Sequence, residues 1–261
     1  MATSENDAMS MVESETNRLL SKLLQQVTAL SIHQRFVALG PERVFEFLYA
    51  DKIFRMYLPF ATQDLIQRFI LTRGRFFELP YLTTVQAMIP PKAVVVDAGA
   101  NIGNHTLFFS DVYGASQVYS FEPLRETFRI LERNIALNRL INVTPINAVL
   151  GEQPGRAQLG SYTAANTGQS SFLGGDAGGY EMTSIDSLGL ERLDFLKMDV
   201  EGGHVAALRG ARETLIRCRP LVWIELRQKH GEFATGSAAL KSMGYRLKQS
   251  LGPNDHLFVS E

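Results

Sequence analysis

The sequence has only one cysteine, Cys218, among its 261 residues, so no disulfide can form within the chain. It also lacks an apolar run of the roughly 20 residues that a membrane-spanning helix needs. Neither sign of charge dominates, because 26 basic and 27 acidic residues leave a formal net charge of −1, and this excludes the basic surface typical of nucleic-acid-binding proteins. The first twenty residues contain four acidic residues and one arginine, the wrong polarity for a signal peptide. We therefore expect a cytoplasmic protein with no membrane span and no nucleic-acid partner.

The most informative stretch runs from Lys92 to Asn104. An apolar run, Ala93–Val96, is typical of a strand buried on both faces of a parallel sheet, and Asp97 closes it. Glycines at positions 99 and 103 permit a tight turn, and a helix is predicted from Asn104 to Val112. Such a corner can bind a nucleotide, because the helix N-terminus offers free N–H groups; the alternative is an ordinary strand-to-helix turn.

A second predicted strand, Gln117–Phe121, ends at Glu122. A carboxylate at this position in a doubly wound sheet can accept hydrogen bonds from both hydroxyls of a ribose. The preceding loop is G-x-x-x-G and lacks the G-x-G-x-x-G pattern that brings a pyrophosphate close to the backbone. These features favour an adenosine ligand without a diphosphate, and S-adenosylmethionine is the cofactor that we predict.

Six ordered segments resemble the FkbM family of S-adenosylmethionine-dependent methyltransferases: V-V-V-D-A-G-A-N-I-G-N-H-T, F-E-P, N-V-T-P-I-N-A-V-L, T-G-Q-S-S, D-F-L-K-M-D-V-E-G and L-V-W-I-E-L. The resemblance covers Asp64 to the C-terminus. It implies an α/β fold with a Rossmann-like seven-stranded methyltransferase sheet, mostly parallel, whose last strand is antiparallel. It also implies O-methylation of a hydroxyl on a sugar, glycan or natural product, so that the partner is a small-molecule or glycan acceptor.

Residues 1–63 are predicted to be an N-terminal helical extension, and residues 64–261 the methyltransferase domain. Residues 1–9 have no helical pattern, so we expect them to be disordered. Helices are predicted over Val12–Leu30, where leucines recur every three or four residues, and over Glu42–Ala50. These helices could cover the domain, build a lid over the acceptor, or pair with a second subunit to form a homodimer.

The later strands also end in polar residues. Asn147, at the end of a third strand, can pair with an adenine edge through its amide. A fourth strand, Leu193–Val200, brings Asp199 and Glu201 to the ligand-binding edge of the sheet. Lys197 lies inside this strand, and a buried lysine needs a carboxylate partner, for which Asp97, Asp199 and Glu225 are candidates. The glycine-rich segment 151–180 is predicted to be a functional loop or an added hairpin, and the resemblance places its Ser171 near the pocket.

Candidates for the base that removes the acceptor's proton are, in order of preference, Glu201, His230, His204 and Glu225. For Glu201 the alternative is a structural carboxylate that neutralises Lys197 or caps the next helix. The predicted cofactor-binding residues are Asp97, Gly99, Asn101, Gly103, Asn104, Glu122, Asn147, Ala148, Ser171 and Asp199. No compact ligand motif identifies a metal site, so none is predicted. The rival functions are a nicotinamide-dependent oxidoreductase and a domain that binds S-adenosylmethionine without catalysis.

Overall fold

The computed structural model describes residues 2–161, 171–174, 179–228 and 231–261, and at residues 2–13, 161, 171, 173 and 174 it describes the backbone alone. Its centre is a seven-stranded sheet in the order β12-β13-β11-β10-β3-β4-β5. In that order the strands are Tyr245–Ser250, Asp255–Ser260, Leu221–Glu225, Phe195–Met198, Val94–Ala98, Gln117–Phe121 and Val143–Ile146. Neighbouring strands from β11 to β5 are parallel, whereas β13 is antiparallel to both β11 and β12. The predicted methyltransferase sheet, with its last strand antiparallel, is therefore confirmed.

Helices cover both faces of this sheet. Successive side chains of a strand point to opposite faces, so one strand can contribute to two separate cores. In β3, Val95 packs into the core shared with α2 (Leu65–Arg73), α3 (Leu79–Gln86) and the π-helix η1 (Phe108–Val112), which continues α4 (Asn104–Leu107). Val96 instead packs into the core shared with α6 (His204–Arg209), α7 (Arg212–Cys218) and α8 (Glu232–Lys241). The unbroken apolar run of the sequence thus reflects burial on both faces.

The helix α5 (Arg125–Leu137) follows β4, and a smaller sheet follows β5. The small sheet has the order β6-β9-β7-β8, formed by Val149–Leu150, Tyr180–Thr183, Gly155–Ser161 and Ser171–Gly174. Strands β7 and β8 pair antiparallel, so the glycine-rich segment contains the added hairpin that was one of its two predicted forms. A short 3-10 helix, Asp186–Leu188, connects this sheet to β10.

The predicted helix over Glu42–Ala50 is wrong, because this segment forms part of a β-hairpin. Strands β1 (Val44–Tyr49) and β2 (Lys52–Tyr57) pair antiparallel across Ala50 and Asp51, which have φ angles of 48° and 61°. Positive φ at both central residues is the geometry of a type I′ turn, which matches the twist of a two-stranded ribbon. The aromatic content of β1 fits a strand better than a helix.

The hairpin belongs to the core of the domain. Phe47 and Phe54 are buried against Phe76, with ring centroids 5.1 and 4.9 Å from it. The amide of Asn134 in α5 accepts a hydrogen bond from the backbone N–H of Tyr57 at 2.6 Å. The hairpin before residue 63 therefore packs into the same core as the segments that follow it.

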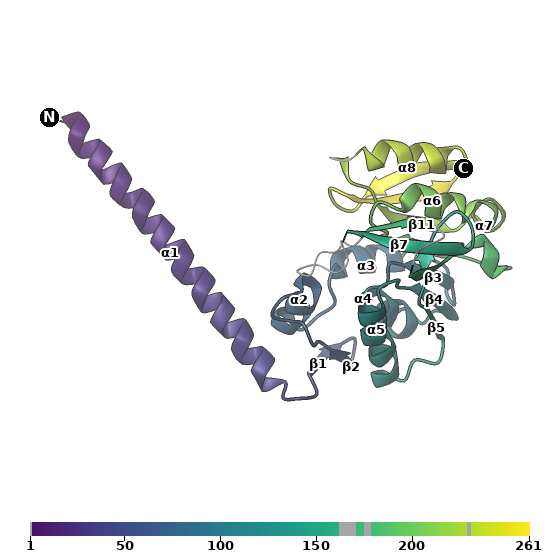
Figure 1. Ribbon diagram of the computed structural model, residues 1–261, viewed down its shortest axis with the longest axis horizontal. Helices are drawn as coiled ribbons and strands as arrows, with labels where there is room; N and C mark the ends of the chain where they lie inside the picture. The colour runs from purple at the N-terminus through teal and green to yellow at the C-terminus, as the bar shows by residue number, and fades with distance from the viewer. Residues whose placement is uncertain (1, 162–170, 175–178, 229–230) are drawn as a thin grey trace.

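A single helix, α1 (Ala2–Ala38), precedes the hairpin and is 37 residues long. It includes residues 2–9, for which the sequence had suggested disorder. In Figure 1 it extends away from the domain, which it meets only near its C-terminal end, beside α2. Within the described residues no helix combines the length and the apolar content of a membrane span.

Candidate functional site

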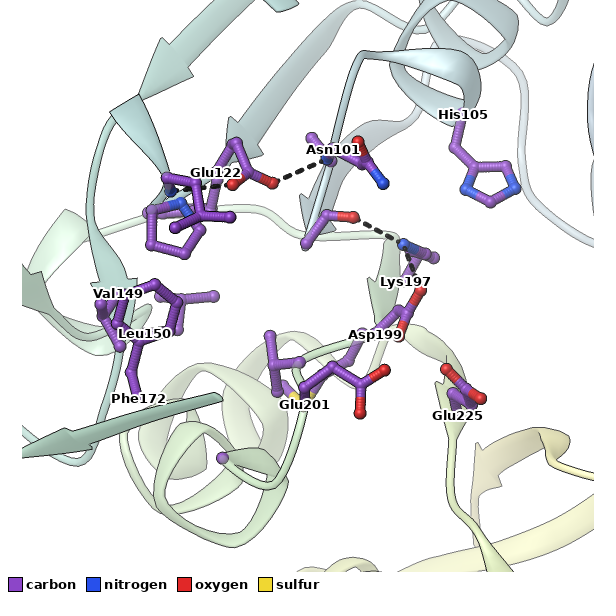
Figure 2. A pocket seen from close by; sticks show the side chains of 18 of the residues that line it. Asn101, His105, Glu122, Val149, Leu150, Phe172, Lys197, Asp199, Glu201 and Glu225 are labelled. Carbon is purple, nitrogen blue, oxygen red and sulfur yellow. Dashed lines mark hydrogen bonds and ion pairs between the residues drawn. The ribbon is translucent and has the colours of Figure 1, made fainter. Parts of the chain in front are cut away.

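A cavity of ≈ 250 Å³ opens at the carboxyl ends of β3, β4, β10 and β11 (Figure 2). Ligands of open α/β sheets bind at this edge, since the loops that leave parallel strands diverge there. One end of the cavity is apolar and is lined by Ala148, Val149, Leu150 and Phe172. The other end carries charged groups from several strands, so the cavity can bind a ligand with an apolar part and a charged part.

The loop after β3 forms the cavity wall through its backbone. Gly99 has a φ of +80°, and a Cβ atom placed there would lie 1.9 Å from the carbonyl oxygen of Asp199, so only glycine fits. Asn101 also adopts the left-handed conformation, with a φ of 50°. Its Oδ1 atom is buried at the cavity and has no hydrogen-bond partner among the described residues. A buried acceptor without a partner is costly, so this atom is suited to a ligand donor.

Glu122 holds this loop in place. Its Oε2 atom accepts the backbone N–H of Asn101 at 3.0 Å, and its Oε1 atom accepts that of Leu124 at 2.8 Å. Burial of the carboxyl raises the pKa of Glu122 to about 7, although both N–H bonds favour the charged form. Each oxygen keeps a lone pair for a further donor. The carboxylate can therefore shape the loop and still accept hydroxyl groups of a ligand.

Asn147 takes a different role from the one predicted. Its Nδ2 atom donates to the backbone carbonyls of Glu122 and Pro123, at 2.8 and 3.0 Å, and the residue is not among those that line the cavity. The amide thus fixes the turn that carries Glu122. The next residue, Ala148, lines the cavity.

Lys197 is buried in β10, and two of its three predicted carboxylate partners, Asp97 and Asp199, lie beside its ammonium group. Its Nζ atom donates to the carbonyl oxygen of Gly99 at 3.0 Å and lies 3.5 Å from Asp97 Oδ1 and 3.7 Å from Asp199 Oδ2. Burial alone would lower the pKa of Lys197, but the charges of Asp199 and Asp97 outweigh it and raise the pKa. Asp97 also accepts a hydrogen bond from Thr106 at 2.7 Å and is fully buried away from the cavity. Asp97 is therefore part of the support beneath the loop and does not meet the cavity.

Three carboxylates converge at the charged end of the cavity, where oxygens of Asp199, Glu201 and Glu225 lie within 4.8 Å of one another. Burial, followed by the charge of Asp199, raises the pKa of Glu225 to about 9, so this group is protonated at neutral pH. Although burial opposes it, the charge of Lys197 and a hydrogen bond from Glu225 hold the pKa of Asp199 below its ordinary value. Asp199 and Glu225 thus form a pair in which Asp199 is the anion.

Glu201 makes a bidentate ion pair with Arg227, which follows β11. This partner differs from Lys197, which the sequence had offered as the structural alternative for Glu201. Burial raises the pKa of Glu201, against the opposing effect of Arg227. The planar guanidinium fixes the direction of the carboxylate, so that its remaining lone pairs face the cavity in a defined orientation.

Sequence reasoning missed a second group at the charged end, built around His105. Its Nε2 atom lies 3.2 Å from Glu78 Oε2, and its ring packs edge-on against Trp223 at 5.3 Å. Asp255 accepts the indole N–H of Trp223 at 2.8 Å, and all four residues line the cavity. The position of His105 in the first turn after the glycine loop was a signal that could have identified it.

The sequence profile of the Methyltransferase FkbM domain matches residues 97–247, more than half of the chain. The chain belongs to the FkbM methyltransferase family. It is 29% identical over 189 residues to Methyltransferase 1 of Beauveria bassiana (strain ARSEF 2860), covering 62% of this chain and 75% of that protein. It is 28% identical over 164 residues to Methyltransferase sdnD of Sordaria araneosa, covering 49% of this chain and 63% of that protein.

The fold is also similar to that of the methyltransferase FkbM from Methylobacillus flagellatus KT, seen in a crystal structure. The TM-score is 0.53 at 17% sequence identity, with 92% of this chain and 60% of that chain covered. This FkbM-family chain therefore spans less than two thirds of the length of that protein and of sdnD. The structural likeness shows the fold.

Several predicted site residues of this FkbM-family protein lie outside the cavity. Gly103 is not among the lining residues; a Cβ atom there would lie 2.8 Å from Leu131 Cδ1, so the glycine permits close packing on α5. His204 is buried with its Nε2 atom 3.1 Å from Thr235 Oγ1 in α8, and burial lowers its pKa. It does not line the cavity, and its role as a base stays a prediction from the sequence.

Asn104 lines the cavity, but its amide is engaged with the backbone of Phe77. It accepts the N–H of Phe77 at 2.8 Å and donates to the carbonyl oxygen of the same residue at 3.1 Å. His230 lies outside the described residues, and so does the side chain of Ser171. The structure thus brings together at one cavity Gly99, Asn101, Asn104, Glu122, Ala148, Asp199, Glu201 and Glu225.

Proposed function

We propose that this chain is an S-adenosylmethionine-dependent methyltransferase that methylates a hydroxyl oxygen of a small-molecule or glycan acceptor. The observation that carries the proposal is Glu122, whose two oxygens hold the loop after β3 and retain lone pairs toward the cavity. The residues fit an adenosyl ligand, because the cavity has an apolar end beside this carboxylate and a buried acceptor, Asn101 Oδ1, without a partner among the described residues. The loop has the form G-x-x-x-G. It lacks the middle glycine of G-x-G-x-x-G, which lets the backbone approach a diphosphate.

In this assignment each part of the cavity has a role in holding the cofactor. Ala148, Leu150 and Phe172 would pack against the adenine, and Glu122 would accept the ribose hydroxyls. Asp199, the anion of its pair with Glu225, would bind the ammonium group of the methionyl part. Asn101 Oδ1, which has no partner among the described residues, would accept a donor of the same part.

When bound, S-adenosylmethionine supplies an activated methyl group, so the protein mainly has to align the acceptor oxygen and exclude water. Glu201 is the residue that we assign to the acceptor hydroxyl, as base or as the group that orients it, and Arg227 fixes its direction. Glu225 is protonated at neutral pH, so it serves as a hydrogen-bond donor and not as the base. His105, held by Glu78, is the alternative proton acceptor at this end of the cavity.

The test has two stages. First, S-adenosylhomocysteine should protect the protein against thermal unfolding, whereas reduced nicotinamide cofactor should not. Protection by the nicotinamide cofactor alone would favour a nicotinamide-dependent oxidoreductase instead. Second, hydroxylated small molecules and glycans are screened with a labelled methyl donor, and the label should appear as a methyl ether. Cofactor binding without transfer to any acceptor class would favour a non-catalytic binding domain. Label recovered on nitrogen or carbon would contradict O-methylation while leaving the methyltransferase assignment intact.

A further inference from the structure

The helix α1 presents an apolar surface that the rest of the described chain does not cover. Its large exposed side chains are 55–68% accessible to solvent and comprise Leu19, Leu20, Leu23, Leu24, Val27, Leu30 and Val37. Figure 1 shows the helix extending well beyond the domain, so none of the other described residues lies over most of its length. A contiguous apolar stripe of this size on a solvated helix indicates an interaction site.

The stripe follows a heptad repeat. With Leu20 at position a, the a and d positions from residue 16 to residue 37 are Thr16, Leu20, Leu23, Val27, Leu30, Gln34 and Val37. This spacing is the seam of a left-handed coiled coil, in which a and d side chains pack into a partner helix. Leu19 and Leu24 occupy positions g and e, which flank the seam and widen it.

The face that binds the domain is the opposite one. Ile32 and Phe36, at positions f and c, are partly buried, and Phe36 packs against the core that includes α2. The guanidinium of Arg43 lies over the Phe36 ring at 4.1 Å and donates to its carbonyl oxygen at 2.7 Å. The domain is thus anchored on one side of α1 and leaves the seam free on the other.

The distribution of charge favours a second copy of the same helix as the occupant of the seam. From residue 14 to residue 38 the Asp, Glu, Lys and Arg side chains are Glu15, Arg18, Lys22 and Arg35, all at positions b, c or f. Two copies can therefore pair without like charges at the seam. Over the whole of α1 the four acidic residues, at positions 5, 7, 13 and 15, slightly outnumber the three basic ones, unlike the basic face of a helix that lies on anionic membranes.

The polar position in the seam indicates the orientation. In a parallel pair each seam residue meets its own copy, so Gln34 faces Gln34 and the two amides can bond to each other. In the same arrangement Leu19 at g meets Leu24 at e of the partner, which accounts for the apolar flanks. In an antiparallel pair in which Val27 faces Leu30, Gln34 would instead face Leu23, leaving an amide against an apolar side chain. In the antiparallel register in which Val27 faces Leu23, Gln34 would face Thr16, but Val37 would face the carboxylate of Glu13.

The area suffices for self-association. Each exposed seam leucine offers on the order of 100 Å² of apolar surface, so a pair of helices buries roughly 1,000–1,500 Å², within the range of specific interfaces. We propose that α1 forms a parallel two-stranded coiled coil with α1 of a second copy of this chain, through the seam from Thr16 to Val37. This surface is separate from the cavity at the sheet edge, so the pairing does not depend on the proposed methyltransferase activity.

Sedimentation of the full-length protein at micromolar concentrations tests the pairing, and the expected mass is twice 29.1 kDa. The variant Leu23→Glu/Leu30→Glu places charges in the seam and should weaken self-association by roughly 100-fold or more. The matched control Gln25→Glu/Thr28→Glu adds the same charges at positions f and b and should remain paired. Because all four positions are exposed in the single chain, both variants should keep the near-ultraviolet circular dichroism of the folded domain. A monomer at every concentration, or equal behaviour of the two variants, would overturn the proposal.

Cysteine cross-linking tests the orientation in a Cys218→Ser background, which leaves no other thiol. Gln34→Cys should oxidise readily to a disulfide-linked pair, because only a parallel seam brings the two copies of residue 34 together. Arg35→Cys, one residue away and at position b, should stay largely unlinked. A dimer in sedimentation in which Gln34→Cys links no better than Arg35→Cys would refute the parallel arrangement.

Discussion

Replacing Glu122 by glutamine tests the centre of the proposed site with a change of almost no volume. In the wild-type protein both carboxylate oxygens accept backbone N–H groups, from Asn101 at 3.0 Å and from Leu124 at 2.8 Å. A glutamine amide has one oxygen, so its NH₂ group must face one of these two donors, or turn away and leave it unpaired. The substitution therefore removes one anchor of the loop and one charged acceptor for the ribose.

The expected loss of affinity follows from the bonds removed. A hydrogen bond to a charged group contributes roughly 1.5–3 kcal/mol, which corresponds to a weakening of S-adenosylhomocysteine binding by about 10- to 100-fold. Isothermal titration calorimetry at pH 8, where the carboxyl of the wild-type protein is ionised, measures this difference. Glu126→Gln, at an exposed position in the first turn of α5, is the matched control and should bind like the wild type.

The pH dependence of binding gives a second, independent check. Burial raises the pKa of Glu122 to about 7, so the empty site is largely protonated below that pH and ionised above it. Only the carboxylate accepts both ribose hydroxyls without rearrangement, so wild-type affinity should fall as the pH drops from 8 to 6. The affinity of Glu122→Gln should lack this component. An affinity within threefold of wild type, with the same pH profile, would refute the ribose assignment.

The same shift predicts a change in stability. The Glu122 pKa is raised from 4.5 to about 7 in the folded protein, so between these values the folded state binds more protons than the unfolded state. Stability from this group is therefore lost as the pH rises through this window, by roughly 3 kcal/mol at most. Relative to wild type, Glu122→Gln should gain stability in urea unfolding as the pH rises from 5 to 8. Comparing the two proteins cancels the similar contributions of Glu225 and Asp255, and a difference that does not change with pH would contradict the argument.

Three further predictions concern other parts of the chain. Glu201→Gln should keep the affinity for S-adenosylhomocysteine but lower methyl transfer by ~10²–10⁴-fold, and turnover within threefold of wild type would exclude the base role; joint loss of stability and cofactor binding would instead make Glu201 structural. In Gly99→Ala the added methyl group clashes with the carbonyl oxygen of Asp199, so the free energy of unfolding, measured in urea, should fall several-fold more than in Gly114→Ala. Gly114 is the control because it has a similar positive φ and open space around it, and its replacement should cost about 1 kcal/mol. Deleting residues 1–38 should leave cofactor affinity unchanged in calorimetry, whereas a deletion that also removes β1 should unfold the domain. If the 39–261 chain is folded but does not bind the cofactor, α1 belongs to the cofactor site.

The sequence alone was enough to predict the sheet and the edge where the cavity lies. Buried parallel strands are short apolar runs; Glu122 and Asp199 directly follow two of them, and Glu225 is the last residue of a third. Because the carboxyl ends of parallel strands meet at one edge, their order along the chain predicts their convergence in space. The role of Gly99 could also be predicted from the sequence, because a tight turn directly after a strand often requires glycine.

Local pattern was insufficient where two forms of secondary structure competed. The segment Glu42–Ala50 has helical spacing, but burial of Phe47 against Phe76 and the type I′ turn that follows stabilise a strand. Both stabilising contributions depend on residues outside the segment. The period of the apolar residues therefore could not decide between helix and strand here.

Only the tertiary structure decided which polar side chains meet. Arg227 pairs with Glu201, 26 residues earlier, and His105 lies beside Glu78, 27 residues earlier. Asn147 directly follows β5, and its amide turns to the carbonyls of Glu122 and Pro123. Where a strand ends is set by the local chain, and the sequence therefore determined where the site lies. The direction of each side chain and its partner depend on the packing of distant segments, and these only the folded structure decided.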